Sequence, residues 1–211
     1  DSTYVGILRI AAVPSMFISL LPQALARFKK TFPKVHIHIH ESGSQEILND
    51  VLKDNIDLGL TIVSNDHSKS MSSSLQIRPI LRGQMHVGVS KYSALASKRE
   101  IFMNELQKYP VVMYGAENWN GFVGNYEKNI GKLNVFLTTS NSESLKQMIS
   151  KDLAVGLLTD IMSSSDSLTT DNIILIPLTD YTPEFLSFGA ISLKHKKSQL
   201  VDRFLDLMTI N

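Results

Sequence analysis

The sequence contains no cysteine among its 211 residues. This absence excludes disulfide bonds, thiolate metal ligands and a cysteine nucleophile, and it fits a reducing compartment. No apolar run approaches the roughly 20 residues that span a bilayer. The start, DSTYVGILRI, also lacks the order of basic, apolar and small residues that marks a signal peptide. A cytoplasmic location is therefore expected.

The chain also lacks an excess of charge of either sign. It has 21 Lys and Arg against 20 Asp and Glu, which leaves a formal net charge of +1. The chain as given therefore has no electrostatic attraction for nucleic acid or an anionic membrane. Its length and its 43% of hydrophobic residues are sufficient for one large domain or two lobes.

Strand and helix patterns alternate through the first sixty residues. VGILRIAAV predicts a strand, and apolar side chains at helical spacing predict a helix over residues 14–32. VHIHI at 35–39 predicts the second strand, Ser42-x-x-Gln45 predicts a capping box at the next helix, and residues 56–63 predict the third strand. This order with short connections predicts a parallel sheet with right-handed crossovers.

A second series of elements follows the polar, serine-rich stretch 64–74, which predicts a surface loop. The predicted strands are 85–90, 110–114, 133–138, 153–159, 172–178 and 185–193. The predicted helical segments are 101–106, 122–130, one that begins with the capping box Ser140-x-x-Glu143, and a last one from about Ser198. A second sheet is therefore expected, and the fold class is α/β.

Three histidines, His36, His38 and His40, share one face of the second predicted strand. The strand from the first to the third spans roughly 13 Å, so a zinc ion with bonds of about 2.0–2.1 Å cannot readily take all three. A neighbouring pair could share a metal with ligands from elsewhere, but no second cluster completes such a site, and we expect no metal and no cofactor. The polar face instead predicts an edge strand, where a partner subunit could pack.

Motifs for catalysis and for phosphate binding are missing. The sequence has no Gly-x-Ser-x-Gly elbow, no Walker A loop and no Gly-x-Gly-x-x-Gly turn. None of the six histidines lies in a recognisable general-base motif. We therefore expect no enzymatic activity.

One pattern occurs three times: a predicted strand ends in a short polar turn that leads into a helix. The turns are residues 14–15, 42–44 and 138–142. Helix N-termini bind carboxylate and phosphate groups through unpaired N–H donors and the helix dipole. In open α/β sheets, ligands bind beyond the carboxyl ends of the strands. A serine at a helix start can equally be a simple cap, so both interpretations remain open for each turn.

An ordered series of short motifs runs through the first sixty residues. The motifs are Leu8-Arg9-Ile10, Pro14-Ser15, Leu20-Leu21-Pro22, Phe28, Phe32-Pro33-x-Val35, Glu41-Ser42-Gly43 and Asp57-Leu58-Gly59-Leu60. This series resembles the start of the effector-binding domain of LysR-type transcriptional regulators. The segments PILRGQMHVGVSKYSALA, SNSESLKQMISKDLAVGLLTD and FGAISLKHKKSQLVDRFLDLM extend the likeness over nearly the whole chain. It departs from the family pattern at Ala11, Lys151-Asp152 and Thr159-Asp160.

The resemblance implies two Rossmann-like α/β lobes joined by two crossover strands, as in type 2 periplasmic binding proteins. Residues 1–80 and 187–211 would form lobe I and residues 81–186 lobe II. A small polar or carboxylate effector would be held between the lobes and would control DNA binding and transcription by the full-length protein. DNA contact would belong to an N-terminal winged helix-turn-helix absent from this chain, and the protein would be a homodimer or homotetramer.

By the same resemblance, the effector site would be formed by residues from both lobes. These are Ser15, Met16, Phe17, Ser44, Gln45, Thr61, Tyr114, Gly115, Trp119, Thr139, Ser140 and Asn141. No arginine falls in these turns, which favours a monocarboxylate, an amino acid or a neutral polar molecule over a di- or tricarboxylate. The alternatives are an extracytoplasmic solute-binding protein of a transporter with the same fold, and an enzyme on this fold with an acid or base of shifted pKa in the cleft.

Overall fold

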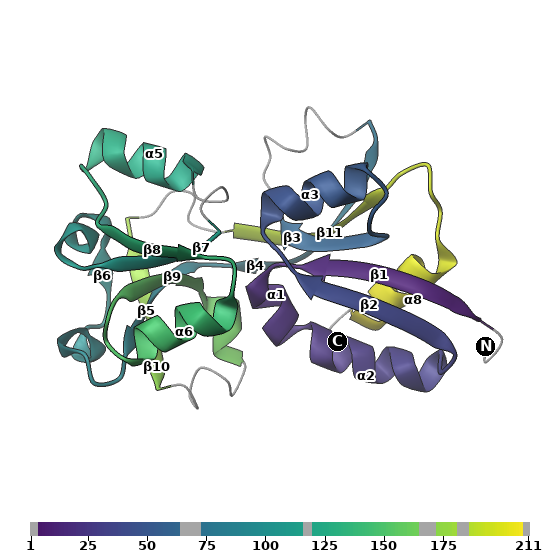
Figure 1. The fold of residues 1–211 in the computed structure, drawn as a ribbon, viewed down its shortest axis with the longest axis horizontal. Helices are drawn as coiled ribbons and strands as arrows, with labels where there is room; N and C mark the ends of the chain where they lie inside the picture. The colour runs from purple at the N-terminus through teal and green to yellow at the C-terminus, as the bar shows by residue number, and fades with distance from the viewer. Residues whose placement is uncertain (1–3, 64–72, 116–119, 165–171, 181–185, 209–211) are drawn as a thin grey trace. The chain divides into compact units, whose positions relative to one another are not determined.

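The structure is a computed structural model that describes residues 4–63, 73–115, 120–164, 172–180 and 186–208 (Figure 1). The chain divides into two compact units. Unit 1 comprises Asp1–Arg82 and Ser187–Asn211, and unit 2 comprises Gly83–Leu186. No helix in the described residues is both long enough and apolar enough to cross a bilayer.

Unit 1 is built on a five-stranded sheet in the order β2-β1-β3-β11-β4. Its strands are β1 (Gly6–Ala12), β2 (Val35–Glu41), β3 (Leu58–Ile62), β4 (Leu75–Gly83) and β11 (Leu186–Leu193). Strands β1, β2 and β3 are parallel, as predicted, and β11 is antiparallel to β3. The prediction that the histidine-bearing strand lies at a sheet edge is confirmed for β2, on which His36, His38 and His40 are exposed.

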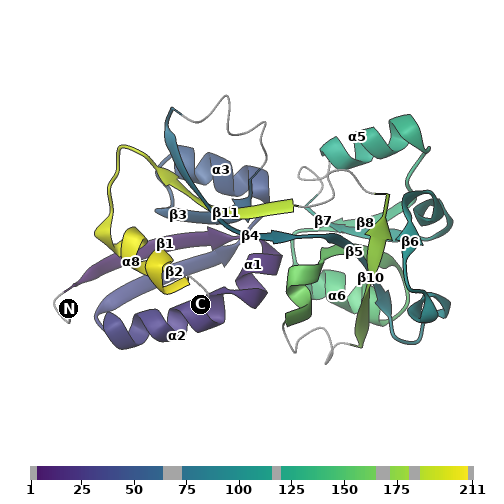
Figure 2. The ribbon, with the colours of Figure 1, turned by 180° about the vertical axis from the view of Figure 1, so that it is seen from behind.

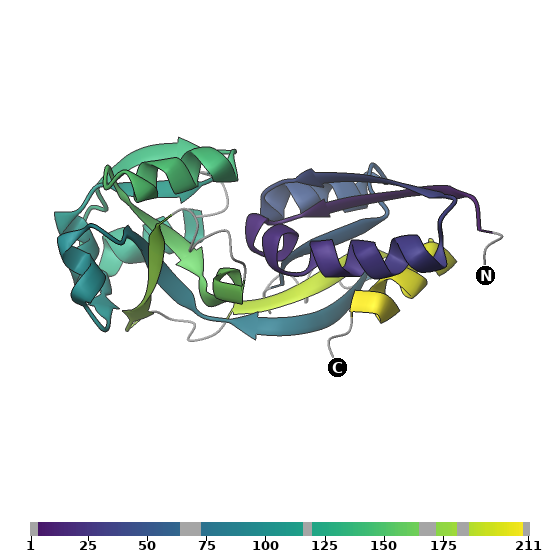
Figure 3. The same ribbon diagram turned by 90° about the horizontal axis from the view of Figure 1, so that it is seen from below.

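The helix predicted over residues 14–32 is in fact two helices, α1 (Pro14–Ser19) and α2 (Leu21–Thr31). The chain bends at Leu20 (φ −108°, ψ −39°), two residues before Pro22, which has no N–H to donate to the carbonyl one turn back. Helix α2 packs beside α8 (Gln199–Met208), with the rings of Phe28 and Phe204 5.3 Å apart (Figure 3). This contact closes one face of the sheet, because both rings are fully buried.

Helix α3 (Ser44–Leu52) lies on the other side of the sheet (Figure 1). It packs closely on Gly59 in β3, where an added Cβ would lie 2.5 Å from Ile47 Cγ2 and 2.8 Å from Ile191 Cγ1. Glycine therefore allows α3 to approach the strand, and this close packing sets the position of the helix above β3.

Unit 2 has a six-stranded sheet in the order β6-β10-β5-β9-β7-β8 (Figure 2). Its strands are β5 (Met85–Ser90), β6 (Ile101–Phe102), β7 (Val111–Tyr114), β8 (Val135–Thr139), β9 (Val155–Thr159) and β10 (Ile173–Thr179). Strand β7 is parallel to both β8 and β9, whereas β5 is antiparallel to β9 and β10. Unit 2 therefore contains three parallel strands whose carboxyl ends share one edge.

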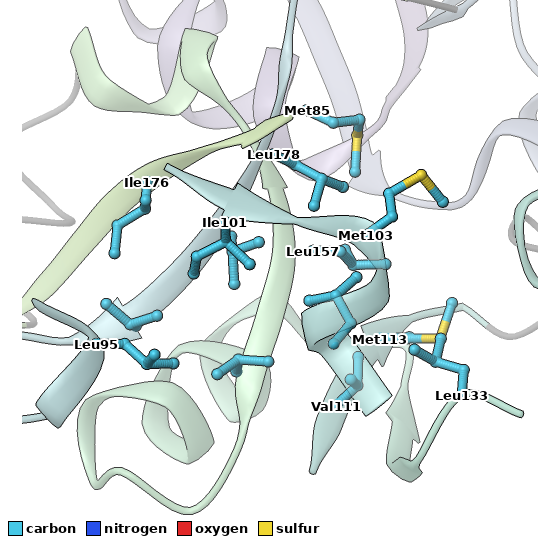
Figure 4. Close-up of a cluster of buried hydrophobic side chains, with 14 of the residues drawn as sticks. Met85, Leu95, Ile101, Met103, Val111, Met113, Leu133, Leu157, Ile176 and Leu178 are labelled. Carbon is cyan, nitrogen blue, oxygen red and sulfur yellow. The ribbon is translucent and has the colours of Figure 1, made fainter. Parts of the chain in front are cut away.

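Helices cover both faces of this sheet. Helix α6 (Ser142–Ser150) packs on one face, where a Cβ added to Gly156 would lie 2.3 Å from Ile149 Cδ1. The other face carries an apolar cluster that includes Met85, Met113 and Leu157 (Figure 4). Tyr126 from α5 (Asn120–Asn129) belongs to the same cluster.

The sequence prediction of a helix over 101–106 was wrong. Residues 101–102 form the short strand β6, which pairs with β10, and only Met103–Lys108 is helical, as the 3₁₀ helix η2. The buried side chains of Met103 and Leu106 have the spacing of a helix face, but Ile101 is buried as part of the sheet. Periodicity alone cannot separate these two cases in so short a segment.

A network of charges joins the amino end of β3 to β1 and to the segment before α8. The Arg9 guanidinium bonds both carboxylate oxygens of Asp57, at 2.8 Å and 3.2 Å, and the Arg9 N–H donates to the same carboxylate at 2.9 Å. Lys196 Nζ reaches Asp57 at 3.2 Å and Asp54 at 2.6 Å. Burial raises the pKa of the Asp57 carboxyl, but the hydrogen bonds from Arg9 and Lys196 outweigh burial and hold the pKa below its ordinary value.

This network predicts acid-sensitive stability in unit 1. Because the folded-state pKa of Asp57 is lowered, the stabilisation is present above the ordinary carboxyl pKa of about 3.9 and is lost as pH falls through the lowered value. Asp57→Asn is expected to lower the free energy of unfolding by about 1–2 kcal/mol at pH 7, and by much less at pH 2–3. Urea denaturation at both pH values measures this difference, and an equal loss at both would contradict it.

Candidate functional site

The carboxyl ends of β1, β2 and β3 bring the predicted turns of unit 1 together. Ala12 pairs with Glu41 on one side and with Leu60 on the other. Beyond the strands, Val13 N donates to Leu60 O at 2.9 Å and Ser42 N donates to Ala12 O at 3.1 Å. The turns that follow β1 and β2 and the end of β3 therefore lie at one edge of the sheet, as expected for a ligand site in this class of fold.

The first turn leads directly into helix α1, with Pro14 at its first position. Ser15 is 7% exposed, Met16 is fully buried, and Phe17 is half-buried. The Ser19 hydroxyl donates to Ser15 O at 2.6 Å, which holds this short helix together. Ser15 and Phe17 therefore retain some exposure at this edge, whereas Met16 is part of the core.

The second turn differs from the predicted capping box. Helix α3 begins at Ser44 with Gly43 as its N-cap, and no side chain caps it. The Ser42 hydroxyl donates to the Glu46 carboxylate instead of capping the helix, because it lies two residues before the helix start. The capping-box prediction was therefore wrong. The first backbone N–H groups of a helix have no intrahelical acceptor, so an uncapped α3 start can receive an anion.

Thr61 lies in β3 at the same edge. Its side chain is 3% exposed, and Oγ1 has no hydrogen-bond partner in the part of the chain that the structure describes. Strand alternation places Thr61 on the face of Gly59, which is the face that α3 covers. Because α3 follows β2 and runs back along the sheet, its N-terminus lies at the carboxyl edge where Thr61 is found. A buried hydroxyl without a partner costs about 1–3 kcal/mol, which is unusual in a purely structural position.

The predicted residues of unit 2 also meet at one edge. Tyr114 at the end of β7 pairs with Thr139 at the end of β8, and Gly115 N donates to Thr139 O at 2.8 Å. Gly115 has a positive φ of 59°, which a glycine adopts without strain as the chain leaves β7. Trp119 lies outside the described residues.

The capping box Ser140-x-x-Glu143 predicted Ser140 as the N-cap of helix α6, but the helix begins one residue later. Its N-cap is Asn141, whose Oδ1 accepts from Ser144 N at 2.8 Å, and Thr139 Oγ1 accepts from Asn141 N at 3.1 Å. The amide oxygen of an asparagine accepts from the N3 amide as well as a serine does, so Asn141 replaces Ser140 as the cap. Ser140 is exposed. The start of α6 therefore has a side-chain cap, Asn141, which the start of α3 lacks.

Two polar residues at this end of unit 2 were not among the predicted site residues. Thr159 ends the strand β9 and is 6% exposed, and Lys146 on α6 is 8% exposed. Lys146 Nζ pairs with Glu143 Oε2 at 2.9 Å, and the hydrogen bonds from Lys146 and then Gln147 lower the pKa of Glu143. One sequence feature could have indicated Thr159. It ends the apolar run Val-Gly-Leu-Leu-Thr, and Leu-Gly-Leu-Thr in β3 also ends in Leu-Thr.

The described residues contain no group of three or more His, Cys, Asp or Glu side chains that could hold a metal ion. His36 and His38 lie with their rings 4.7 Å apart, and His40 Nε2 is 3.9 Å from Asp50 Oδ2. The histidine face of β2 thus presents a pair of rings in edge-to-face contact and a separate contact to α3.

Each unit therefore has the features of a ligand-binding α/β module: parallel strands ending at one edge, with helix starts and hydroxyl side chains gathered there. The LysR substrate binding domain family matches residues 2–210, and the chain belongs to this family. The curated relative HTH-type transcriptional regulator CysB of Haemophilus influenzae is 27% identical over 196 residues, which is 90% of this chain and 57% of that protein. The chain thus spans a little over half the length of this relative.

Solved structures show the same fold. The regulatory domain of CcmR from Synechocystis PCC6803, in complex with 2-PG, has a TM-score of 0.77 at 17% identity, covering 96% of this chain and 95% of that one. The effector binding domain of QuiR, in complex with shikimate, has a TM-score of 0.76 at 14% identity, covering 97% and 96%. The predicted fold, two α/β lobes as in type 2 periplasmic binding proteins, is confirmed.

Proposed function

We propose that this chain is the effector-sensing domain of a LysR-type transcriptional regulator. It binds a small polar or carboxylate metabolite, and binding controls how the full-length protein binds DNA and regulates transcription. Membership of the family and the names of the curated relatives support this role. The related domains of QuiR and CcmR, solved in complex with shikimate and 2-PG, support a small ligand.

The observation that carries the proposal is the combination of Thr61 and the α3 start. Thr61 Oγ1 is buried without a partner, and α3 has no side-chain cap. A carboxylate at this edge would accept hydrogen bonds from Ser44 and Thr61, and the helix dipole would stabilise its negative charge. Ser15, Phe17 and Gln45 would add further ligand contacts in unit 1.

In unit 2, the turns after β7 and β8 are the candidate ligand contacts of this proposal. Their residues are Tyr114, Gly115, Trp119, Thr139, Ser140 and Asn141. Since the side-chain oxygens of Thr139 and Asn141 already accept from local backbone N–H groups, this turn offers the Ser140 hydroxyl, the O–H donor of Thr139 and the N–H donors of the Asn141 amide. In unit 2, that inventory favours neutral polar groups of a ligand.

An effector bound in this way acts by population shift. It moves the equilibrium between two arrangements of the domain only by its differential affinity for them, on a usual scale of about 1–3 kcal/mol. The readout would be DNA binding by a segment outside this chain, in a cytoplasmic homodimer or homotetramer. The domain itself performs no catalysis and needs no cofactor.

An extracytoplasmic solute-binding protein with the same fold is the second candidate. The curated relatives are named transcriptional regulators, which favours the first candidate. The sequence encoded upstream of Asp1 discriminates the two: a basic helix-turn-helix segment supports the regulator, and a signal sequence or lipobox cysteine supports the transporter component.

A thermal-shift screen of metabolites tests the sensing role. A ligand present at 100 times its Kd adds about 2.7 kcal/mol to the free energy of unfolding, so a true effector raises Tm clearly. The double variant Ser15→Ala with Asn141→Ala is expected to lose the shift produced by the best compound. Because Asn141 caps α6, its loss also lowers the ligand-free stability by about 1 kcal/mol. The measured quantity is therefore the increase in Tm on adding the compound, not Tm itself.

The matched control is Ser93→Ala with Asn55→Ala. Ser93 caps the 3₁₀ helix η1 (Ala94–Ser97) and Asn55 bonds Asp50 at 2.9 Å, so these changes also remove local hydrogen bonds. Both residues lie at the amino edges of the parallel strands, and the ligand-induced shift is expected to persist. Loss of the shift in the control, or its persistence in the site variant, would contradict the site assignment.

A further inference from the structure

Only two buried side-chain oxygens or nitrogens in the described part of the chain lack a hydrogen-bond partner. They are Thr61 Oγ1 in unit 1 and Thr159 Oγ1 in unit 2. Buried polar groups are nearly always paired, so each exception requires an explanation. The proposed effector site accounts for Thr61, and Thr159 remains to be explained.

Thr159 lies at the edge where unit 2 would meet a ligand. Val155 in β9 pairs with Val111 in β7, so Thr159, four residues further on, reaches the same level as Gly115. Gly115 in turn bonds Thr139 in β8. The hydroxyl of Thr159 therefore belongs to the carboxyl edge formed by β7, β8 and β9.

The surroundings of this hydroxyl are apolar. In β9, Gly156 and Leu158 face α6, whereas Val155 and Leu157 belong to the apolar cluster on the other face of the sheet (Figure 4). Alternation places Thr159 on the cluster face, beside its antiparallel partner Met85, which is 2% exposed. Valine has the same shape and would be buried here without the cost of an unpaired hydroxyl. The retention of threonine therefore points to a use for the hydroxyl.

We infer that Thr159 is a further effector-binding residue, which bonds a neutral polar group of the ligand, such as a hydroxyl, carbonyl or amide. An apolar surrounding disfavours a charged group, so a neutral polar group is the partner expected at Thr159. The ligand group that reaches Thr159 is itself removed from water, as most of a small ligand is. This role of Thr159 rests on the proposed function. Within that function, Thr159 contributes to ligand specificity.

The first test needs no ligand. Thr159→Val is expected to raise the Tm of the ligand-free protein by about 2–4 °C, because the unpaired hydroxyl is replaced by a methyl group. The matched control is Ser90→Ala in the same unit. Ser90 is 1% exposed, but its hydroxyl donates to Ser150 O at 3.1 Å and accepts from Tyr92 N at 3.3 Å, so Tm is expected to fall. An unchanged or lower Tm for Thr159→Val would overturn the inference and leave the proposed function untouched.

The second test uses pairs of carboxylates that differ by one hydroxyl: propionate with lactate, and benzoate with 3-hydroxybenzoate, with shikimate as a further probe. Where the hydroxylated member binds the wild type more tightly, Thr159→Val is expected to lose that advantage, about tenfold in Kd, and Thr159→Ser to retain it. If Thr159→Val binds every probe like the wild type, Thr159 is not a ligand contact. If the wild type itself responds to none of them, the carboxylate form of the proposed function fails as well.

Discussion

Replacement of Ser44 by aspartate is expected to weaken the binding of a carboxylate effector at least about 100-fold while the fold remains stable. Ser44 is the first residue of α3, where the helix dipole and N–H groups that have no intrahelical acceptor favour negative charge. An aspartate there stabilises the helix by about 0.3–1 kcal/mol. It also places a fixed negative charge where the effector carboxylate would bind, and like charges in contact cost several kcal/mol.

The control for this variant is Ser44→Asn, which has the shape of aspartate without its charge. It is expected to reduce affinity less than tenfold, since it adds bulk but no repulsion. Isothermal titration of both variants with the best compound from the metabolite screen measures the two effects, and thermal denaturation confirms that both fold. Equal losses for Ser44→Asp and Ser44→Asn would mean that bulk, not charge, matters there. Binding unaffected by the aspartate would place the carboxylate elsewhere.

Gly59→Ala is expected to destabilise unit 1 by about 2–3 kcal/mol. The added methyl group would lie 2.5 Å from Ile47 Cγ2, 2.8 Å from Ile191 Cγ1 and 3.2 Å from Val51 Cγ2. All three side chains are almost completely buried and branched at Cβ, so they have no room and few rotamers with which to move away. Relief requires α3 to shift outward, which would also move its N-terminus away from Thr61. We therefore expect a loss of effector affinity in the fraction that folds.

Gly124→Ala provides the matched control. Gly124 lies in α5 and is exposed, and a Cβ there would meet nothing within 4 Å. Alanine in a helix is more stable than glycine by about 0.5–1 kcal/mol, so this variant is expected to be neutral or slightly stabilising. Urea denaturation of the two variants separates a steric cause from a general effect of glycine replacement. A Gly59→Ala protein as stable as Gly124→Ala would show that α3 does not pack closely on β3.

Much of the fold was predictable because its pattern is local. The strands β1, β2 and β3 and their parallel order follow from apolar runs separated by short connections. The polar face of β2 predicted its place at the sheet edge. The boundaries of helices were less predictable: the capping boxes at Ser42 and Ser140 had the expected spacing, yet the caps are Gly43 and Asn141. Several small polar residues follow one another in each turn, and any of them could have been the cap.

The places of the candidate turns in the fold were predictable, but their hydrogen bonding was not. The resemblance to the LysR family pointed to the turns after the strands, and the structure brings Ser15, Ser44 and Thr61 to one edge and Tyr114 and Thr139 to another. The sequence pattern did not distinguish the turn at 42–44 from the turn at 138–142. In the structure, however, Asn141 satisfies the start of α6, whereas the start of α3 has no side-chain cap.

The sequence by itself determined the order of elements, the family and the absence of cysteine chemistry, since these depend on composition and on neighbours a few residues apart. Only the tertiary structure decided which hydroxyls are paired. Ser90 finds its acceptor sixty residues away in Ser150, whereas Thr61 and Thr159 find none in the described chain. Hydrogen bonding in a core depends on groups brought together from distant segments, so the position of a threonine at the end of a strand could not reveal whether its hydroxyl was satisfied or available to a ligand.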